Sequence, residues 1–360
     1  MHRGIDMKKL CLILSGYVLI GIICYSRLIQ AHGYIPAAGA ATSSSWEMLP
    51  LAELAVLLER GQLLGQSEVM AVKIKRQIHS YYHQEPGIKS AYLYAKVLQR
   101  EHQFSQALNV LTSLLEKAPR QANARLLQAN ILMVQGFYRK AKQSCLALTG
   151  HIALTAVAIC ALDADSQALG QKAGQQAQLR QNYQSLINLL AKDKQPEQAI
   201  LLWANQVLAE MALRLNRPLA AQQHLKGVAL SRAPVSLIAL WADIELALGH
   251  HDLVLTKLPA FAIQAQTQRL PDAILLRLAI AEKNSKAQTA NNYQWQVLMA
   301  ERVKLRESRR ENDHGAQLAR YYLDVKPDNK KAKHWAVINY QQAKMASDRA
   351  LLDRALSQGG

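Results

Sequence analysis

Two histidines offer the most obvious opportunity for chemistry in this sequence, and that chemistry is metal binding. His79 and His83 are four residues apart, so a helix would carry both imidazole groups on one face. Tyr81 and Tyr82 lie between them, Pro86 follows soon after, and no third metal-binding side chain is close in the sequence. The pair therefore predicts a solvated helix end, and we expect neither a metal site nor a cofactor.

The short motifs that accompany catalysis are absent from the sequence. It contains no Gly-x-Ser-x-Gly nucleophile turn, no Walker loop, no dinucleotide fingerprint and no Cys-x-x-Cys pair. The 26 aspartates and glutamates are scattered, without an obvious facing pair for acid–base catalysis. The chain is 50% hydrophobic and 19% charged, and it is rich in Ala, Leu and Gln. This composition favours a folded, helical protein, and we expect that it is not an enzyme.

The elements that position any functional surface begin with an apolar segment at the amino terminus. Lys8 and Lys9 precede an uncharged run from Leu10 to Ser26, and Arg27 ends it. As a helix this run would rise roughly 25 Å, which is less than the ~30 Å hydrocarbon core of a bilayer. It suits either a cleaved signal peptide or a short anchor, and the lysines keep the preceding end cytoplasmic. We therefore predict an exporting segment at 1–30, a flexible stalk at 31–45 and a folded helical domain at 46–357.

A repeat of about 34 residues organises the remainder of the chain. One unit recurs 34 positions later, so that Phe104, Ala107, Leu111 and Leu114 correspond to Tyr138, Ala141, Cys145 and Leu148. A weaker pair of units, offset by 33 positions, begins at Leu208 and Trp241. Small residues at fixed positions let two antiparallel helices approach closely, and breakers such as Pro119 end the second helix. The pattern predicts an all-α solenoid of helix hairpins, with an irregular helical bundle as the alternative.

These residues resemble the tetratricopeptide repeat (TPR). The resemblance rests on Phe104-x-x-Ala107, on Tyr138-x-x-Ala141, on Gly136 and Gly249 in the turns, and on Pro119. Segments from Gln128 to Cys160 and from Ala319 to Leu352 also look like a group of bacterial envelope TPR proteins without an assigned activity. The resemblance implies a right-handed α-solenoid of TPR-like hairpins after the signal or anchor helix. It also implies a location on the periplasmic face of the inner membrane, or free in the periplasm if the signal is cleaved.

In such a solenoid the first helix of each hairpin lines a concave groove, which holds a segment of a protein partner. The repeat register assigns these residues to the groove: Lys89, Tyr92, Lys96, Arg100, Asn130, Gln206, Glu210 and Arg214. Lys96, Asn130 and Arg214 would form a polar set suited to a peptide with acidic groups, and ordinary solvated helix faces are the alternative. We therefore predict a scaffold that binds a protein or peptide partner of the cell envelope.

Two of the four cysteines fall on consecutive helices that the register predicts to pack antiparallel. If the turn is centred on Gly150, Cys160 lies about 7 Å too far along its helix to face Cys145. A longer turn would close most of that gap. An oxidising compartment favours a disulfide, and so does the envelope resemblance, whose motif includes both cysteines. Two buried thiols that act as small apolar side chains are the open alternative.

The net charge of +17 points to an anionic partner. Basic residues cluster at 73–76, 302–310 and 326–333. Export and the lack of interleaved aromatic residues argue against nucleic acid. Anionic lipid headgroups, an acidic polysaccharide or an acidic protein remain, beside an ordinary soluble basic surface. The alternative function is therefore direct binding of an anionic envelope polymer by these basic ridges.

Overall fold

The computed structural model describes residues 48–64, 68–195, 197–265, 269–285 and 293–358. In these ranges the chain forms helices and turns, with one isolated β-bridge. The predicted export segment at 1–30 and the predicted stalk at 31–45 lie outside the described residues. No helix within the described ranges is both long enough and apolar enough to cross a bilayer. The all-α prediction is confirmed for this part of the chain.

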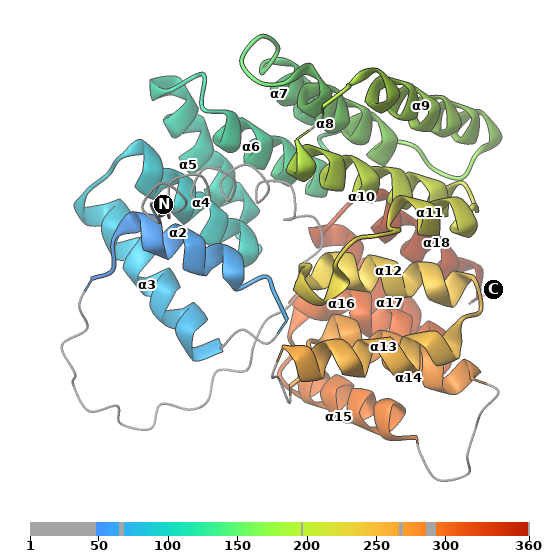
Figure 1. Ribbon diagram of the computed structural model, residues 1–360. Helices are drawn as coiled ribbons and strands as arrows, with labels where there is room; N and C mark the ends of the chain where they lie inside the picture. The colour runs from blue at the N-terminus through green and yellow to red at the C-terminus, as the bar shows by residue number, and fades with distance from the viewer. Residues whose placement is uncertain (1–47, 65–67, 196, 266–268, 286–292, 359–360) are drawn as a thin grey trace, which may run out of the picture.

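Consecutive helices pair as hairpins that follow one another around the molecule (Figure 1). The first helices of the hairpins are α2 (Leu51–Arg60), α4 (Ile88–Arg100), α6 (Ala122–Val134), α8 (Leu154–Gln167), α10 (Gln198–Arg214), α12 (Val235–Ala247), α14 (Asp272–Asn284) and α16 (Gly315–Arg320). The second helices are α3 (Glu68–Gln84), α5 (Phe104–Lys117), α7 (Tyr138–Leu146), α9 (Ala173–Lys192), α11 (Pro218–His224), α13 (His251–Gln264), α15 (Gln294–Ser308) and α17 (Asn329–Gln342). The repeated hairpins agree with the TPR resemblance.

Shorter elements complete the described chain. Two 3₁₀ turns, η1 (Leu230–Arg232) and η2 (Asn312–His314), precede α12 and α16, and α16 continues as a π-helical turn, η3 (Tyr321–Val325). The last helix, α18 (Ala346–Ser357), packs on α17 and α16. It occupies the position of the capping helix that a solenoid needs to cover the apolar face of its final repeat.

Four of the turns within hairpins share one backbone motif. In each turn the second residue after the helix has left-handed backbone; these residues are His102, Gly136, Asn216 and Gly249, with φ of 57°, 80°, 56° and 78°. In each turn the next amide donates to a carbonyl five residues earlier, as from Phe137 N to Leu132 O at 2.8 Å. This Schellman arrangement satisfies carbonyls that the ending helix leaves without partners. It explains why three of these four positions hold glycine or asparagine, which tolerate left-handed backbone, and the fourth holds histidine.

Small side chains lie where paired helices approach closely. Ala95, Ala107, Ala129 and Ala141 are fully buried, at 0% exposure. They belong to a hydrophobic core that runs from α4 to α14, while two smaller clusters lie beneath α14–α18 and beneath α2–α4. Because alanine removes the bulk that would separate two helix backbones, these positions set the spacing within and between hairpins.

Both ends of the described chain return to its middle (Figure 1). After α2 the chain reaches the start of α12, where Val235 N donates to Gln62 O at 3.0 Å. At the other end, the linker between α17 and α18 reaches the α6–α7 turn, where Lys344 N donates to Val134 O at 2.7 Å. Leu64 and Met345, one from each of these returning segments, are buried in the main core. The chain therefore closes on itself and covers part of its own inner face.

Candidate protein-interaction site

Several residues that the sequence assigned to an open groove are buried in the structure. Lys96, Asn130 and Gln206 have exposed fractions of 3%, 7% and 1%. Lys96 forms an ion pair with Glu59 of α2, because α2 packs against the face of α4 that the register turned inward. The expectation that these three side chains line an open groove is wrong for this closed structure. The register placed them on the inward face, but neighbouring parts of the chain cover that face.

Two predicted groove arginines serve as contacts between hairpins. Arg214 on α10 donates to Ser166 O at 2.7 Å and to Leu169 O at 2.8 Å, at the end of α8. Arg100 on α4 donates to Leu58 O in the last turn of α2. Cations at helix carboxyl ends satisfy free carbonyls and oppose the helix dipole. Burial lowers the pKa of Arg100 to about 10, which still leaves it charged at neutral pH.

The remaining predicted groove residues are not gathered into one surface. Gln206 donates to Glu210 at 3.0 Å within α10. Lys89 is exposed at the start of α4, and Tyr92, one turn later, is half-buried with the Lys96 ammonium 5.6 Å from its ring centre. Partner binding through Lys89 and Tyr92 stays a prediction.

An open cleft lies elsewhere, between the neighbouring second helices α5 and α7. It has a volume of about 400 Å³ and is lined by Leu108, Thr112, Arg125, Gln128, Leu132, Lys140, Gln143 and Ser144. Leu108 and Leu132 are half-buried and supply apolar surface, whereas Lys140 and Gln143 are exposed on α7. Arg125 adds a second cation from α6. We call this cleft the α5–α7 groove.

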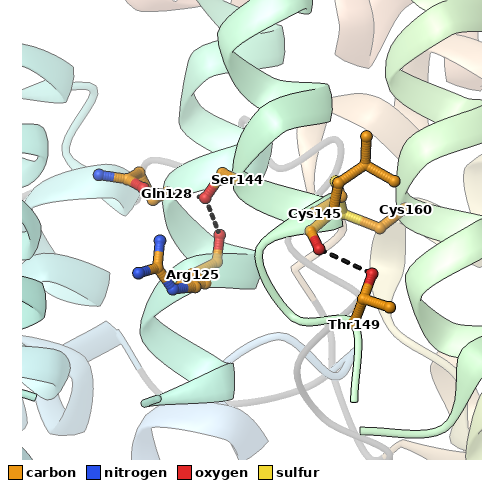
Figure 2. Close-up of a disulfide and its surroundings, with 7 residues drawn as sticks. Arg125, Gln128, Ser144, Cys145, Thr149 and Cys160 are labelled. Atoms are coloured by element: carbon orange, nitrogen blue, oxygen red, sulfur yellow. Dashed lines mark hydrogen bonds between the residues drawn. A yellow bond between two sulfur atoms is a disulfide. The ribbon is translucent and has the colours of Figure 1, made fainter. Parts of the chain in front are cut away.

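Hydrogen bonds hold the walls of the α5–α7 groove in place. The Ser144 hydroxyl on α7 lies 2.9 Å from Gln128 Oε1 and 3.1 Å from Arg125 O, both on α6. Figure 2 shows Ser144 pointing from its helix towards these two residues. The Arg125 guanidinium in turn donates through Nε to Pro119 O at 2.7 Å, at the end of α5. Helices α5, α6 and α7 are thus linked by polar contacts along the groove.

A disulfide lies directly behind this groove. Cys145 on α7 and Cys160 on α8 are bonded, with Cα atoms 5.6 Å apart, and both are buried (Figure 2). The sequence analysis proposed this pairing and left two free thiols as the open alternative, and the structure contains the bond. The connection from Ala147 to Ala153 is long enough to bring Cys160 alongside Cys145. The bond closes a loop of 15 residues and stabilises the fold by about 3 kcal/mol, chiefly through the unfolded state.

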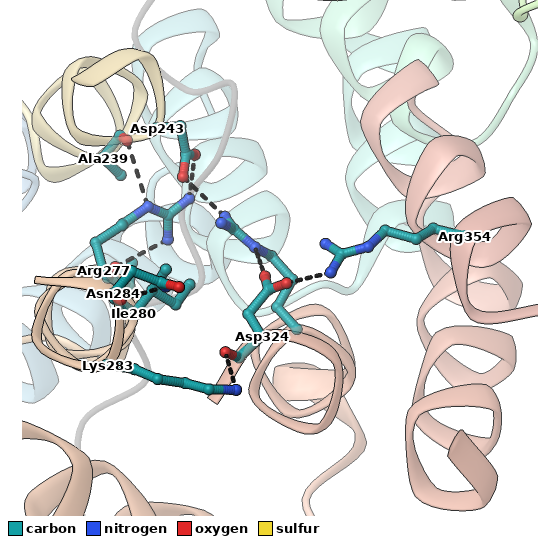
Figure 3. A network of polar contacts seen from close by, with 10 residues as sticks. Ala239, Asp243, Arg277, Ile280, Lys283, Asn284, Asp324 and Arg354 are labelled. Carbon is teal, nitrogen blue, oxygen red and sulfur yellow. Dashed lines mark hydrogen bonds and ion pairs between the residues drawn. The ribbon is translucent and has the colours of Figure 1, made fainter. Parts of the chain in front are cut away.

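A network of charged side chains joins the later hairpins (Figure 3). Asp243 on α12 accepts from Arg277 of α14 at 2.5 Å and from Arg320 of α16 at 2.9 Å. Asp324 in η3 binds Arg320 at 3.4 Å and also contacts Arg354 of α18. Burial alone would raise the pKa of Asp243, but the two guanidinium groups outweigh it and hold this pKa below its usual value.

A second network of charged side chains joins the two helices of the next hairpin, α14 and α15. Asp272, at the start of α14, binds Arg306 at 3.1 Å and Arg302 at 3.2 Å, both on α15. The side chains of Asp272 and Arg306 are only 4% exposed. Sequence analysis counted Arg302 and Arg306 in a basic surface cluster, but the structure turns both towards Asp272. The exposed cations of this region are instead Lys304, Arg309, Arg310, Lys326, Lys330, Lys331 and Lys333.

The histidine pair belongs to an aromatic cluster at the end of α3. The rings of His79 and His83 are 4.3 Å apart, and both stand edge-on to Tyr94 of α4, at 5.4 Å and 5.7 Å. Tyr94 is stacked on Tyr82 at 4.4 Å. In the part of the chain that the structure describes, no group of three His, Cys, Asp or Glu side chains could hold a metal ion.

Comparisons with known proteins give a similar solved structure. No protein-family model matches the chain, and no curated protein matches it. The crystal structure of the P58(IPK) TPR domain, at 2.5 Å resolution, aligns with 16% identity over 85% of this chain and 99% of that chain. Its TM-score is 0.25, so no argument about this chain rests on the superposition. The chain is similar to a solved TPR domain. Its TPR-like character rests on the hairpins, alanine contacts and Schellman turns described above.

Proposed function

We propose that the protein is a non-enzymatic TPR-like scaffold on the outer face of the inner membrane. Its α5–α7 groove binds a protein segment that carries an acidic side chain next to an apolar one. The observation that supports this proposal is that one open cleft combines an apolar floor with two cations. Leu108 and Leu132 form the floor, and Arg125 and Lys140 are the cations. A repeat solenoid supplies such surfaces without the need for a catalytic group.

The chemistry of the groove supports a peptide more than a small molecule. Gln128 and Gln143 provide amide donors and acceptors beside the cations, and such groups suit the carboxylates and carbonyls of a polypeptide. Complementary charge mainly accelerates encounter and selects the partner, while apolar contacts hold it. The neighbouring disulfide keeps α7 in place, which lowers the ordering cost of binding.

Site-specific photocrosslinking in the native cells tests this proposal. A photoreactive amino acid at Gln143, in the groove, should give a discrete crosslinked protein, and the same group at exposed Gln184 on α9 should not. Lys140→Glu should abolish the crosslink, whereas Arg180→Glu on α9 should leave it unchanged. Identical crosslinked products from positions 143 and 184 would refute the groove as the binding site.

The anionic-polymer alternative is favoured by one observation. The clusters at 302–310 and 326–333 lie side by side, since Lys331 of α17 binds Glu307 of α15 at 3.2 Å. Lys304, Lys330 and Lys333 are exposed on these two helices. Binding to heparin, as an acidic polysaccharide probe, should fall steeply with ionic strength and with Lys330→Glu/Lys333→Glu. Capture at the α5–α7 groove should respond much less to either change.

A further inference from the structure

The linker between α17 and α18 is held as a peptide ligand would be held. Ala343 and Met345 have extended backbone, with φ and ψ of −130° and 128°, and of −64° and 162°. Lys344, between them, presents both of its backbone polar groups to the α6–α7 hairpin. Its N–H donates to Val134 O at 2.7 Å, and its carbonyl accepts from the Tyr138 hydroxyl.

The residues two positions away continue this pattern. Gln342 O accepts from Gln135 Nε2 at 3.0 Å, and Ala346 N donates to Gln167 Oε1 at 3.1 Å. Residues 342, 344 and 346 thus turn backbone groups to the same side, as one edge of a β-strand does. Recognition through the backbone sets the register of an extended segment and leaves specificity to the side-chain pockets.

One side chain of the linker is an apolar anchor. Met345 is 4% exposed and lies in the main core, with Ala343 packed partly against the same core. Lys344 passes over the α6–α7 turn, where a Cβ on Gly136 would come within 3.1 Å of its Cδ. Glycine at position 136 therefore allows both the left-handed turn and the close passage of the linker.

We propose that Val134, Gln135, Tyr138 and Gln167 form a second peptide-binding site, which we call the closure site, and that residues 342–346 occupy it in cis. Its external ligand is an extended protein segment with methionine, or a similar unbranched apolar side chain, at the position of Met345. A partner binds there by displacing the chain's own segment. The inference rests on the proposed scaffold function. A partner reaches the closure site only when the carboxyl-terminal segment 342–346 leaves it.

Tethering explains why the closure site is occupied in the isolated chain. A segment on a short tether acts at an effective concentration on the order of millimolar, so a free peptide of equal affinity competes poorly. Weakening the cis segment raises the fraction of open sites, and the apparent affinity for a free peptide rises in proportion. A strong external ligand would do the same by mass action.

A labelled peptide tests this exchange directly. The probe is a fluorescein-labelled peptide of residues 340–349, and the full chain carries Met345→Asp, which removes the cis anchor. Anisotropy should show at least tenfold tighter peptide binding by this variant than by the unaltered chain. Adding Gln167→Ala, or using a probe with Met345→Asp, should remove most of that gain. Leu356→Asp, an exposed change on α18, should behave like the unaltered chain.

A second measurement covers the case in which Met345→Asp does not fold. Hydrogen exchange of the unaltered chain should show the amides of Lys344 and Ala346 exchanging faster than the amides in the middle of α6. Exchange of these two amides only through global unfolding would overturn the proposal. A folded Met345→Asp chain that does not bind the probe would also overturn it. Neither result involves the α5–α7 groove, so photocrosslinking at Gln143 fails or succeeds independently.

Discussion

Two stretches of the solenoid hold neighbouring hairpins together by different means. From α6 to α8 the fully buried contacts are apolar and covalent, with Ala129 and Ala141 at 0% exposure and the Cys145–Cys160 bond joining α7 to α8. The ion pair of Lys142 with Asp165 between the same two helices is half-buried. From α12 to α18 the networks of charged side chains around Asp243 and Asp272 add to the apolar core. The first stretch is therefore sensitive to reduction and the second to the loss of a charge.

The ionic contacts follow the same period as the apolar ones. Asp243 and Arg277 are 34 residues apart, and so are Asp272 and Arg306. Asp243 and Arg277 lie on the first helices of neighbouring hairpins, α12 and α14, whereas Asp272 and Arg306 lie on the two helices of one hairpin, α14 and α15. The comparison teaches that the repeat prescribes where side chains meet but not which chemistry joins them. The following experiments test that difference, beginning with the largest expected effect.

Asp272→Ala should destabilise the fold by about 3 kcal/mol, because the buried Arg306 charge loses its buried carboxylate partner and keeps only the more exposed Glu311. Urea denaturation followed by circular dichroism measures the change. Asp353→Ala, at an exposed position of α18, is the matched control and should stay within about 0.5 kcal/mol. An Asp272→Ala effect no larger than the control would show that the ion pair does not join these helices.

Cys145→Ser/Cys160→Ser should destabilise the fold by about 3 kcal/mol through the larger freedom of its unfolded state. Reductant should lower the melting temperature of the unaltered chain to a similar degree and should not affect the double variant. The Asp272→Ala chain should keep its sensitivity to reductant, since its disulfide is intact. A melting temperature that is insensitive to reductant would contradict the proposed contribution of the bond.

Stability should also depend on pH through Asp348, which anchors the start of α18. Burial raises the pKa of this carboxyl to about 6, although Asn339 and the Met345 amide donate hydrogen bonds to it. The folded state binds the proton of the Asp348 carboxyl more tightly than the unfolded state does. The contribution of Asp348 to the free energy of unfolding is therefore largest below about pH 4. It falls by about 2 kcal/mol as the pH rises to about 6.

The measurement for Asp348 is a comparison with Asp348→Asn, which cannot titrate. The stability of the unaltered chain relative to this variant should fall between about pH 4 and pH 6 and then level off. His224, whose pKa burial lowers, titrates equally in both proteins and cancels in the difference. Parallel stability curves over this range would contradict the assignment.

The comparison of Gly136→Ala with Gly249→Ala has the smallest expected effect on stability and the most closely matched pair of positions. Both glycines have left-handed backbone in a Schellman turn, so alanine should cost about 1–2 kcal/mol at either position. At Gly249 an added Cβ meets nothing within 4 Å, whereas at Gly136 it meets Lys344 of the linker. Gly136→Ala should therefore be the more destabilising and should speed exchange of the Lys344 amide. Equal effects would count against close docking of the linker.

The sequence alone was sufficient for the features that depend on local periodicity. The alanines at repeat positions and the glycines of the turns predicted helix hairpins, because close helix contacts and left-handed turns restrict which residues fit. The register alone left the pairing of Cys145 with Cys160 open, and the predicted oxidising compartment and the envelope resemblance pointed to the bond that the structure contains. A search for opposite charges 34 residues apart would also have found Asp243 with Arg277 and Asp272 with Arg306.

Only the tertiary structure decided which inward faces are open. Lys96, Arg100 and Arg214 were assigned to a groove because register predicts direction, yet α2 and the end of α8 cover them. The closure of the chain depends on contacts such as Tyr138 with Lys344, which are 206 residues apart. On the linker these contacts use backbone atoms, which every residue carries, so its side chains do not mark them in the sequence. How far a solenoid curves is a sum of small rotations at each hairpin, and that sum determines which surfaces meet.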